Sequence, residues 1–116
     1  MKNTVSLCLN YRFRQLYSRG KSQVAPCLVV YAGKNRCKNG ENRLGITVST
    51  KIGKAHVRNR VRRKIREAYR LSEERIKQGH DIVVVARSRA SSARFEDIER
   101  DLLKCLSSLG MTVEQK

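Results

Sequence analysis

The residues best suited to chemistry form a basic stretch from Lys51 to Arg70, which holds nine lysines or arginines and one acid. Such a set of cations suits phosphate binding rather than acid–base catalysis. At helical spacing, Arg58, Arg62, Arg66 and Arg70 recur at i, i+4 along one side. Like charges at this spacing destabilise a helix by roughly 0.2–0.5 kcal/mol per pair, and a polyanion reverses that sign. Solvated faces normally mix charges, so the pattern favours a nucleic-acid interface over a merely solvated face.

The opposite side of the same stretch carries the apolar residues that position the arginines. At 100° per residue, one apolar stripe contains Val57, Val61, Ile65, Ala68 and Leu71. This spacing predicts an amphipathic helix from near Lys54 to Gln78, preceded by a loop at Gly53 and stopped by Gly79. Asn59 and Arg63 share the basic side, and Arg60 and Lys64 lie on its flanks.

The charge of the chain is confined to its first part. The net charge of +16 arises entirely in residues 1–70, which hold 18 basic and 2 acidic side chains, whereas residues 71–116 hold 8 of each. A basic excess of this size indicates a phosphate-rich partner. The hydrophobic content of 40% indicates a folded chain rather than a disordered basic tail.

Carboxylates and histidines do not form a recognisable catalytic or metal site. The basic part contains only Glu41 and Glu67, and the acids at 96–101 complement the first turns of a C-terminal helix. The two histidines, His56 and His80, flank the long basic helix. We therefore expect no catalytic residue and no metal ligand in this chain, and a protein-only nuclease is disfavoured.

The four cysteines lack metal-binding or redox spacing. Cys27 and Cys105 lie in apolar segments typical of a core, and Cys8 and Cys37 have no role that the pattern assigns. No stretch resembles a signal peptide or a transmembrane helix, and the apolar residues of the basic helix are too small for a membrane-surface helix. We expect a cytoplasmic protein with no membrane partner.

The periodicity predicts one α+β domain over 1–116, with about nine N-terminal and six C-terminal residues loosely ordered. The predicted order is helix, three strands, helix, strand, helix, with the helices packed on a small sheet. Besides the basic helix, the expected helices and strands span 10–20, 23–25, 27–32, 43–50, 80–86 and 92–109. The 80–86 strand is apolar without interruption, as expected when both faces of a sheet are covered.

Phe13 and Tyr17 of the first helix and Tyr31 of the first long strand are three of the six aromatic residues of the chain. Bases of single-stranded RNA stack on such rings at roughly 1–3 kcal/mol each. Equally, Phe13 and Tyr17 share a helix face and suit a core that joins helix to sheet. The pattern alone leaves both interpretations open, and the arginines around these residues slightly favour RNA.

Together these residues resemble the bacterial ribonuclease P protein subunit. The stretch K-I-G-K-A-H-V-R-N-R-V-R-R-K-I-R is similar to that family's signature, a basic loop that leads into an R-N-R helix. Weaker similarities lie in F-R-Q-L-Y-S-R-G, R-L-G-I-T-V-S-T-K and D-I-V-V-V-A-R. The resemblance extends from about Phe13 to Leu109.

The resemblance implies the accessory protein subunit of a ribozyme that removes the 5′ leader of precursor tRNA. The RNA subunit, with Mg²⁺ held mainly by RNA, would perform the hydrolysis. The implied fold is a two-layer sandwich like domain 2 of ribosomal protein S5, with a left-handed β-α-β crossover that opposes the usual right-handed rule. The implied leader-binding residues are Phe13, Tyr17 and Tyr31. The implied contacts to the RNA subunit are Lys51, Lys54, Arg58, Asn59, Arg60, Arg62, Arg63 and Arg66.

Two features depart from the family pattern. The segment before the first helix reads V-S-L-C-L where the family often has a basic cluster, and Arg12 precedes Phe13 where many members have a non-basic residue. The alternative interpretation is a ribosomal or other structural RNA-binding protein, which would not share the R-N-R register. A DNA-binding module is disfavoured, because a strand rather than a short helix precedes the basic helix.

Overall fold

The computed structural model describes residues 4–7, 10–35 and 40–113, which form one five-stranded sheet and three helices. The strands are β1 (Thr4–Ser6), β2 (Lys21–Val24), β3 (Leu28–Lys34), β4 (Asn42–Thr47) and β5 (His80–Ala86). The helices are α1 (Asn10–Arg19), α2 (Ala55–Ser72) and α3 (Phe95–Ser108), with short 3₁₀ turns η1 (Thr50–Ile52), η2 (Glu73–Arg75) and η3 (Ser88–Ser91). The predicted α+β class and the order of its elements are confirmed.

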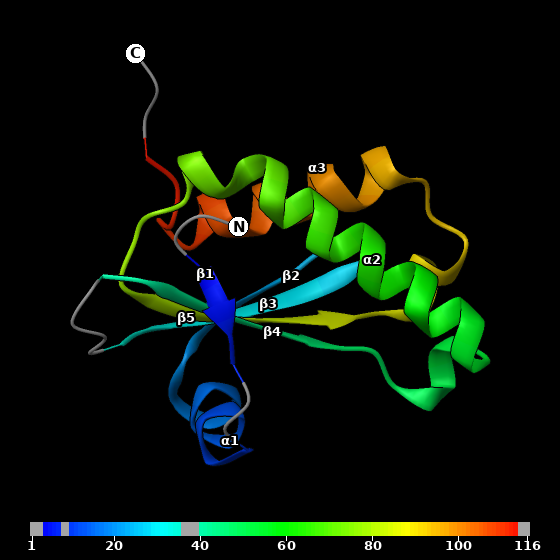
Figure 1. Ribbon diagram of the computed structural model, residues 1–116, viewed down its shortest axis with the longest axis horizontal. Helices are drawn as coiled ribbons and strands as arrows, with labels where there is room; N and C mark the ends of the chain where they lie inside the picture. The colour runs from blue at the N-terminus through cyan, green and yellow to red at the C-terminus, as the bar shows by residue number, and fades with distance from the viewer. Residues whose placement is uncertain (1–3, 8–9, 36–39, 114–116) are drawn as a thin grey trace.

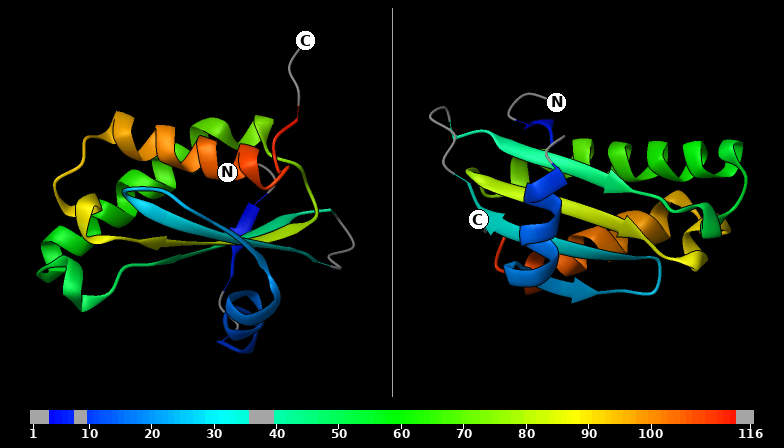
Figure 2. Two further views of the ribbon diagram at one scale, coloured as in Figure 1. Left: turned by 180° about the vertical axis from the view of Figure 1, so that it is seen from behind. Right: turned by 90° about the horizontal axis from the view of Figure 1, so that it is seen from below.

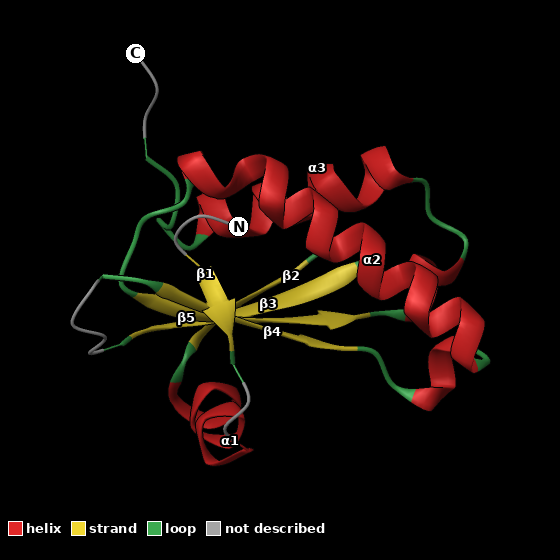
Figure 3. Cartoon of the chain, viewed as in Figure 1, coloured by secondary structure: helices red, strands yellow, loops and turns green. Residues whose placement is uncertain are grey.

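The sheet has the strand order β1-β4-β5-β3-β2, with β4 parallel to both β1 and β5 and the remaining pairs antiparallel. Helices α2 and α3 cover one face, and α1 lies against the other (Figures 1 and 3). The chain leaves β4, runs back through α2 and enters the neighbouring β5, and this crossover is left-handed (Figures 1 and 2). To the two layers expected from the sequence, α1 therefore adds a partial third.

Strand β5 joins the two apolar clusters of the molecule. Ile82 and Val84 are fully buried in the main cluster beneath α2 and α3, whereas Val83 packs with Leu16 of α1 and with Leu7. Successive side chains of a strand point to opposite faces, so a strand covered on both sides must be apolar throughout. The uninterrupted run at 82–85 is explained in this way.

Strand β1 was not predicted. The first nine residues carry little sequence signal, yet Thr4–Ser6 pair with β4 from Thr4↔Asn42 to Ser6↔Leu44. The hydroxyl groups of Thr4 and Tyr69 lie 2.9 Å apart, which ties the strand to α2. Of the other terminal residues expected to be loosely ordered, Leu7 and Met111 are buried and Val113 donates its backbone N–H to the Arg75 carbonyl at 2.7 Å, whereas 1–3, 8–9 and 114–116 lie outside the described part.

Helix α2 is shorter than predicted and its buried stripe is rotated. It ends at Ser72 rather than near Gln78, because Ile76 is buried and Lys77 donates its backbone N–H to Met111 at 2.7 Å. Leu71, predicted to face the sheet, is 55% exposed, whereas Tyr69 and Ser72 are buried. Each step of four residues advances about 40° around a helix, so the stripe that starts at Val57 drifts towards Tyr69 and away from Leu71.

Helix α3 begins at Phe95, three residues later than predicted. Residues 88–91 form η3, and Arg94 is the N-cap, with its backbone N–H donated to the Asp97 carboxylate at 3.2 Å. Ile98, Leu102 and Leu106 face the sheet as expected. Of the described helices, none has the length and apolar character needed to cross a membrane.

Candidate nucleic-acid interface

Eight residues of η1, α2 and the N-cap before α2 form what we call the arginine surface: Lys51, Lys54, Arg58, Asn59, Arg60, Arg62, Arg63 and Arg66. Those in α2 lie on the side of the helix that faces away from the sheet, because Val61, Ile65 and Ala68 bury the opposite side against it. Six of the eight are exposed, and the other two, Arg58 and Arg62, are half-buried. The rotation of the buried stripe towards Tyr69 brings these two arginines closer to the sheet.

The backbone before α2 sets the start of this surface. Gly53 has a φ of 154°, a backbone conformation that residues with a side chain rarely adopt. A side chain at this position would in addition press on Val57, because an added Cβ would lie 3.2 Å from it. Lys54 is the N-cap and makes no side-chain capping bond, and the first turn of α2 contains no acid. The partial positive charge of the helix N-terminus is thus added to the charges of Lys51 and Lys54.

The arginine surface has no acidic partner among the described residues, where none of its members forms an ion pair. Arg62 donates to the Asn59 side-chain oxygen at 3.1 Å, and Arg60 donates to the Ser91 carbonyl at 3.2 Å. By contrast Arg70, the fourth arginine of the i, i+4 column, pairs with Glu67. The uncompensated arginine column therefore ends at Arg66, before the last turn and a half of α2.

The rings of Phe13, Tyr17 and Tyr31, here called the aromatic cluster, meet on the face of the sheet that α1 covers. The Tyr17 and Tyr31 centroids are 4.9 Å apart in an edge-on arrangement, and those of Phe13 and Tyr17 are 6.4 Å apart. Tyr17 is 42% exposed, and its hydroxyl lies 3.3 Å from that of Thr47. Phe13 and Tyr31 are half-buried against the second apolar cluster. The cluster thus combines a packing role with an exposed ring.

Phe13 lies against β4 because residue 45 is a glycine. A Cβ added at Gly45 would lie 2.5 Å from the Phe13 Cζ atom, a distance that real side chains do not tolerate. The sequence places Gly45 on the outward side of a strand without a reason for the glycine. The structure supplies one, since only a residue without a side chain lets the Phe13 ring contact the sheet.

Asp81 anchors the N-terminal half of α1 to the sheet, and sequence reasoning missed this residue. Its carboxylate is fully buried and accepts from Arg12 Nε at 2.6 Å, from Arg43 Nε at 2.7 Å and Nη2 at 2.6 Å, and from Asn35 Nδ2 at 3.1 Å. A second Arg12 nitrogen donates to the Lys34 carbonyl at 2.7 Å. The sequence did contain a signal for this anchor, because Asp81 is a lone acid at the start of an apolar strand. A carboxylate buried there needs a cationic or hydrogen-bonding partner.

Two opposing effects set the pKa of the Asp81 carboxyl. Burial alone raises it, whereas hydrogen bonds from Arg43, Arg12 and Asn35 lower it, and the hydrogen bonds prevail. The pKa of Asp81 therefore lies below its usual value, and the group is a carboxylate at neutral pH. The network carries a net positive charge, because two guanidinium groups surround one carboxylate.

A hollow of about 420 Å³ at the β1 edge of the sheet connects the two predicted surfaces. Arg62 and Arg66 of the arginine surface line it from one side, Phe13 of the aromatic cluster lines it from the other, and Ser6 and Gly45 lie between them. Residues from the first helix and from the long basic helix are thereby brought to one edge. A strand of nucleic acid along this edge would meet both sets of side chains.

Comparisons with known proteins bear on what this surface serves. The family model described as Ribonuclease P matches residues 1–110. A Clostridium botulinum protein named ribonuclease P protein component is 46% identical over 103 residues, which cover 88% of this chain and 91% of that protein. The chain belongs to the ribonuclease P protein family. The identification made from the R-N-R stretch is confirmed, and with it the role as a protein component of ribonuclease P in tRNA 5′ processing.

Solved ribonuclease P proteins have the same fold. The Staphylococcus aureus RNase P protein matches with a TM-score of 0.81 at 31% identity, covering 96% of this chain and 98% of that one. A mutant of the Staphylococcus aureus protein, described as defective in mRNA degradation activity, matches with a TM-score of 0.80 at 31% identity, over 95% and 90% of the two chains. These matches cover 96% and 95% of this chain, so the five-stranded sheet and three helices are the fold of the family.

The structure explains one departure from the ribonuclease P protein pattern. Arg12 does not add to the exposed charge around the aromatic cluster, because its guanidinium is bound to Asp81 and to the Lys34 carbonyl. In the V-S-L-C-L segment, Leu7 is buried and contributes to the second apolar cluster. Cys8 and Cys37 lie outside the described residues, and Cys27 and Cys105 are buried and unbridged as expected.

Proposed function

We propose that this ribonuclease P protein binds the RNA subunit through the arginine surface and the 5′ leader of precursor tRNA through the aromatic cluster. The observation that carries the proposal is the hollow at the β1 edge, which Arg62 and Arg66 share with Phe13. A single-stranded leader that leaves the catalytic RNA at this edge could stack a base on Phe13 in the same hollow that the two arginines line.

We further propose that the RNA subunit performs the hydrolysis and that RNA holds the Mg²⁺. Magnesium needs oxygen ligands in near-octahedral geometry, usually from carboxylates or phosphates. Among the described residues, no three His, Cys, Asp or Glu side chains come close enough to form a metal site. The two buried carboxylates of the described residues already have partners: Asp81 accepts from two arginines and an asparagine, and Asp101 accepts from the backbone N–H of Cys27. The protein's part is to position RNA and to neutralise phosphate charge.

The experiment that tests this division of labour compares cleavage of precursor tRNA by the RNA subunit, the protein and both together. We expect no cleavage by the protein alone at any Mg²⁺ concentration. Added to the RNA subunit, the protein should lower the Mg²⁺ concentration needed for half-maximal cleavage, because its cations replace part of the counterion charge.

The competing result is cleavage of RNA by the protein without the RNA subunit. The Staphylococcus aureus mutant is described as defective in mRNA degradation activity, so the reaction with protein alone is essential. An unstructured RNA should be included as a second substrate in that reaction. Leader removal at the mature 5′ end by RNA-free protein would contradict the proposal. Cleavage of the unstructured RNA alone would reveal a separate activity and leave leader removal with the RNA subunit.

Replacing Arg62 and Arg66 together by alanine should weaken binding to the RNA subunit and reduce its dependence on salt. Each lost phosphate contact should reduce the slope of log affinity against log salt by roughly 0.7–0.9. The fold should persist, because neither side chain belongs to the buried stripe. The measurement is a series of binding isotherms at increasing salt.

The matched control replaces Arg75 and Lys104, two exposed cations of η2 and α3 that lie off the arginine surface. This variant loses the same formal charge, so it reports any effect of net charge alone. If the two variants reduce the slope equally, the arginine surface has no special contact with the RNA subunit.

A further inference from the structure

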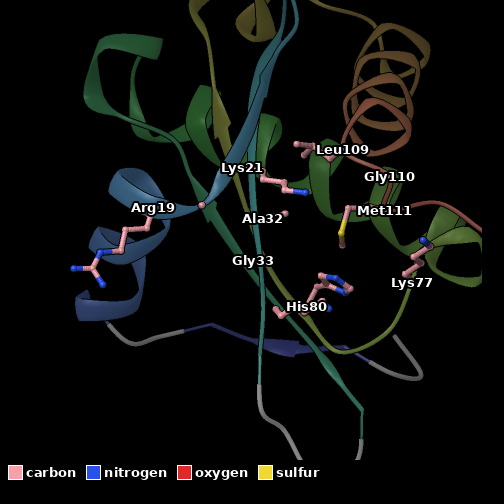
Figure 4. A pocket seen from close by; sticks show the side chains of 11 residues that line it. Arg19, Lys21, Ala32, Gly33, Lys77, His80, Leu109, Gly110 and Met111 are labelled. Atoms are coloured by element: carbon pink, nitrogen blue, oxygen red, sulfur yellow. The ribbon is translucent and has the colours of Figure 1, made fainter.

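A second basic hollow lies on the opposite edge of the molecule, where α3 ends before it has covered the whole sheet. Its volume is about 640 Å³, and we call it the α3-end pocket. Lys21, Lys34, Lys77, His80, Leu109 and Met111 line it. Figure 4 shows Lys21, Met111 and His80 around one space. Cross-strand pairs Lys21↔Ala32 and Lys34↔His80 place these side chains on the face that carries α3.

The positive charge of this pocket is not balanced by acidic side chains of the described residues. Lys21, Lys34 and Lys77 are exposed, and none of the three forms an ion pair with any residue in the described ranges. No aspartate or glutamate is among the residues that line the pocket. Lysines gathered around a concave site repel one another and concentrate anions there. An anionic ligand would relieve this repulsion.

The remaining walls suit a flat ring beside an anion. Leu109 and Met111 supply apolar surface, and Met111 is itself packed into the main core. His80 Nδ1 lies 3.0 Å from the Gln78 carbonyl oxygen, which can only accept, so Nδ1 carries the hydrogen and Nε2 is left for another partner. The volume falls within the roughly 300–1,000 Å³ typical of small-ligand sites.

We propose that the α3-end pocket binds one nucleotide of a single-stranded RNA, with the phosphate at the lysines and the base against His80, Leu109 and Met111. Bases stack on imidazole as well as on larger aromatic rings. The apolar wall and the imidazole favour a nucleotide, because its base can pack against them. An acidic peptide would need only the lysines and would leave these surfaces unused. This is a third RNA contact, beyond the two surfaces of the proposed function.

The position of the pocket separates it from both of those surfaces. Tyr31 points to the face under α1, so its neighbour Ala32, which lines the pocket, points to the face under α3. The arginine surface belongs to η1, α2 and the N-cap before α2, and none of its eight residues lines the pocket. An RNA strand in the α3-end pocket therefore adds contacts without displacing RNA elsewhere.

The chain offers convenient reporters for a test by nuclear magnetic resonance. It contains two methionines, Met1 and Met111, and two histidines, His56 and His80. Met111 and His80 report on the α3-end pocket, whereas His56 lies in the first turn of α2 beside the arginine surface. The full chain would be titrated with a short oligouridylate, with inorganic phosphate and with a polyglutamate peptide, while these signals are followed.

We expect the oligouridylate to shift the Met111 methyl and His80 ring signals saturably. A Lys21→Gln/Lys77→Gln variant should raise the dissociation constant read from Met111 about fivefold at 0.1 M salt, because the pocket holds one phosphate and each single-strand phosphate contact contributes about fivefold there. The His56 response should be kept. An Arg75→Gln/Lys104→Gln variant, with the same loss of charge outside the pocket, should bind at Met111 like the unmodified chain.

Three results would overturn the proposal. In the first, His56 responds to the oligouridylate while Met111 and His80 do not, which leaves the arginine surface intact and the pocket without RNA. In the second, inorganic phosphate shifts Met111 as strongly as the oligouridylate, which reduces the pocket to a simple anion site. In the third, polyglutamate saturates the Met111 signal and the oligouridylate does not.

Discussion

Replacing Asp81 by asparagine should lower the free energy of unfolding by about 3 kcal/mol at neutral pH. Removing one partner of a buried ion pair costs roughly 3–5 kcal/mol, because the other charge stays behind without compensation. Here two guanidinium groups, those of Arg12 and Arg43, lose their shared carboxylate. Their side chains keep 19% and 23% exposure, so water can partly replace the carboxylate and the lower end applies. Urea denaturation measures the change.

The control is Glu67→Gln, which removes the same charge from the exposed pair with Arg70 and should change stability far less. The Asp81→Asn variant should also loosen α1, because Arg12 no longer holds it to the sheet. The aromatic cluster should then lose its fixed geometry, and leader-dependent binding should fall. Equal stability of the Asp81→Asn and Glu67→Gln variants would show that the buried network does not stabilise the fold.

The stabilisation by Asp81 should depend on pH in the acid range. The folded pKa lies below the ordinary value of about 3.9, so the folded state favours the carboxylate. The contribution is fully present above the ordinary pKa and is lost as pH falls through the lowered folded pKa. The stability difference between the unmodified chain and Asp81→Asn should therefore be constant near neutrality and shrink below about pH 4.

Replacing Tyr31 by alanine should weaken binding of precursor tRNA with a leader by roughly 1–3 kcal/mol, the contribution of one stacked base. Tyr31 lies edge-on to Tyr17, so the substitution also removes the support of the most exposed ring in the cluster. Mature tRNA has no leader, and we propose that the RNA subunit binds the arginine surface, so both affinities should stay unchanged. The three affinities are measured with purified components, beside a thermal melt.

Tyr11→Ala is the matched control, because Tyr11 is 58% exposed on α1 and takes no part in the described ring contacts. Tyr31→Phe keeps the ring and should bind the leader nearly normally. The packing interpretation predicts another result, a lowered melting temperature with equal losses for every RNA. That outcome would leave Tyr31 as a core residue and remove it from the leader contact.

The elements with strong periodicity were predicted well. The basic helix, the apolar strand at 80–86 and the C-terminal helix each carry a repeated pattern that tertiary contacts reinforce rather than override. The misplaced boundaries have identifiable causes. The end of α2 depends on the burial of Ile76, and the start of α3 depends on the bond between Arg94 and Asp97, neither of which periodicity reports. Strand β1 is three residues long and has no pattern to detect.

The candidate site was predicted in part. Helical spacing was enough to separate the arginine surface from the buried stripe, because both follow from one 3.6-residue period. The same reasoning left the aromatic residues undecided between packing and RNA. Their arrangement depends on Gly45 and Thr47 of β4 and on the network around Asp81 of β5, two strands that lie far from α1 in the chain. No local pattern relates these segments.

The sequence by itself determined the charge asymmetry, the basic helix with its arginines on one side, and membership of the ribonuclease P protein family. These properties are local, since they rest on composition and on the spacing of neighbouring residues. Only the tertiary structure decided which surfaces meet. The left-handed crossover puts α2 on one face of the sheet, α1 lies on the other, and the β1 edge brings Arg62 and Arg66 to the same hollow as Phe13. The physical reason is that strand pairing joins residues far apart in the chain, and each side chain's face depends on the register of that pairing.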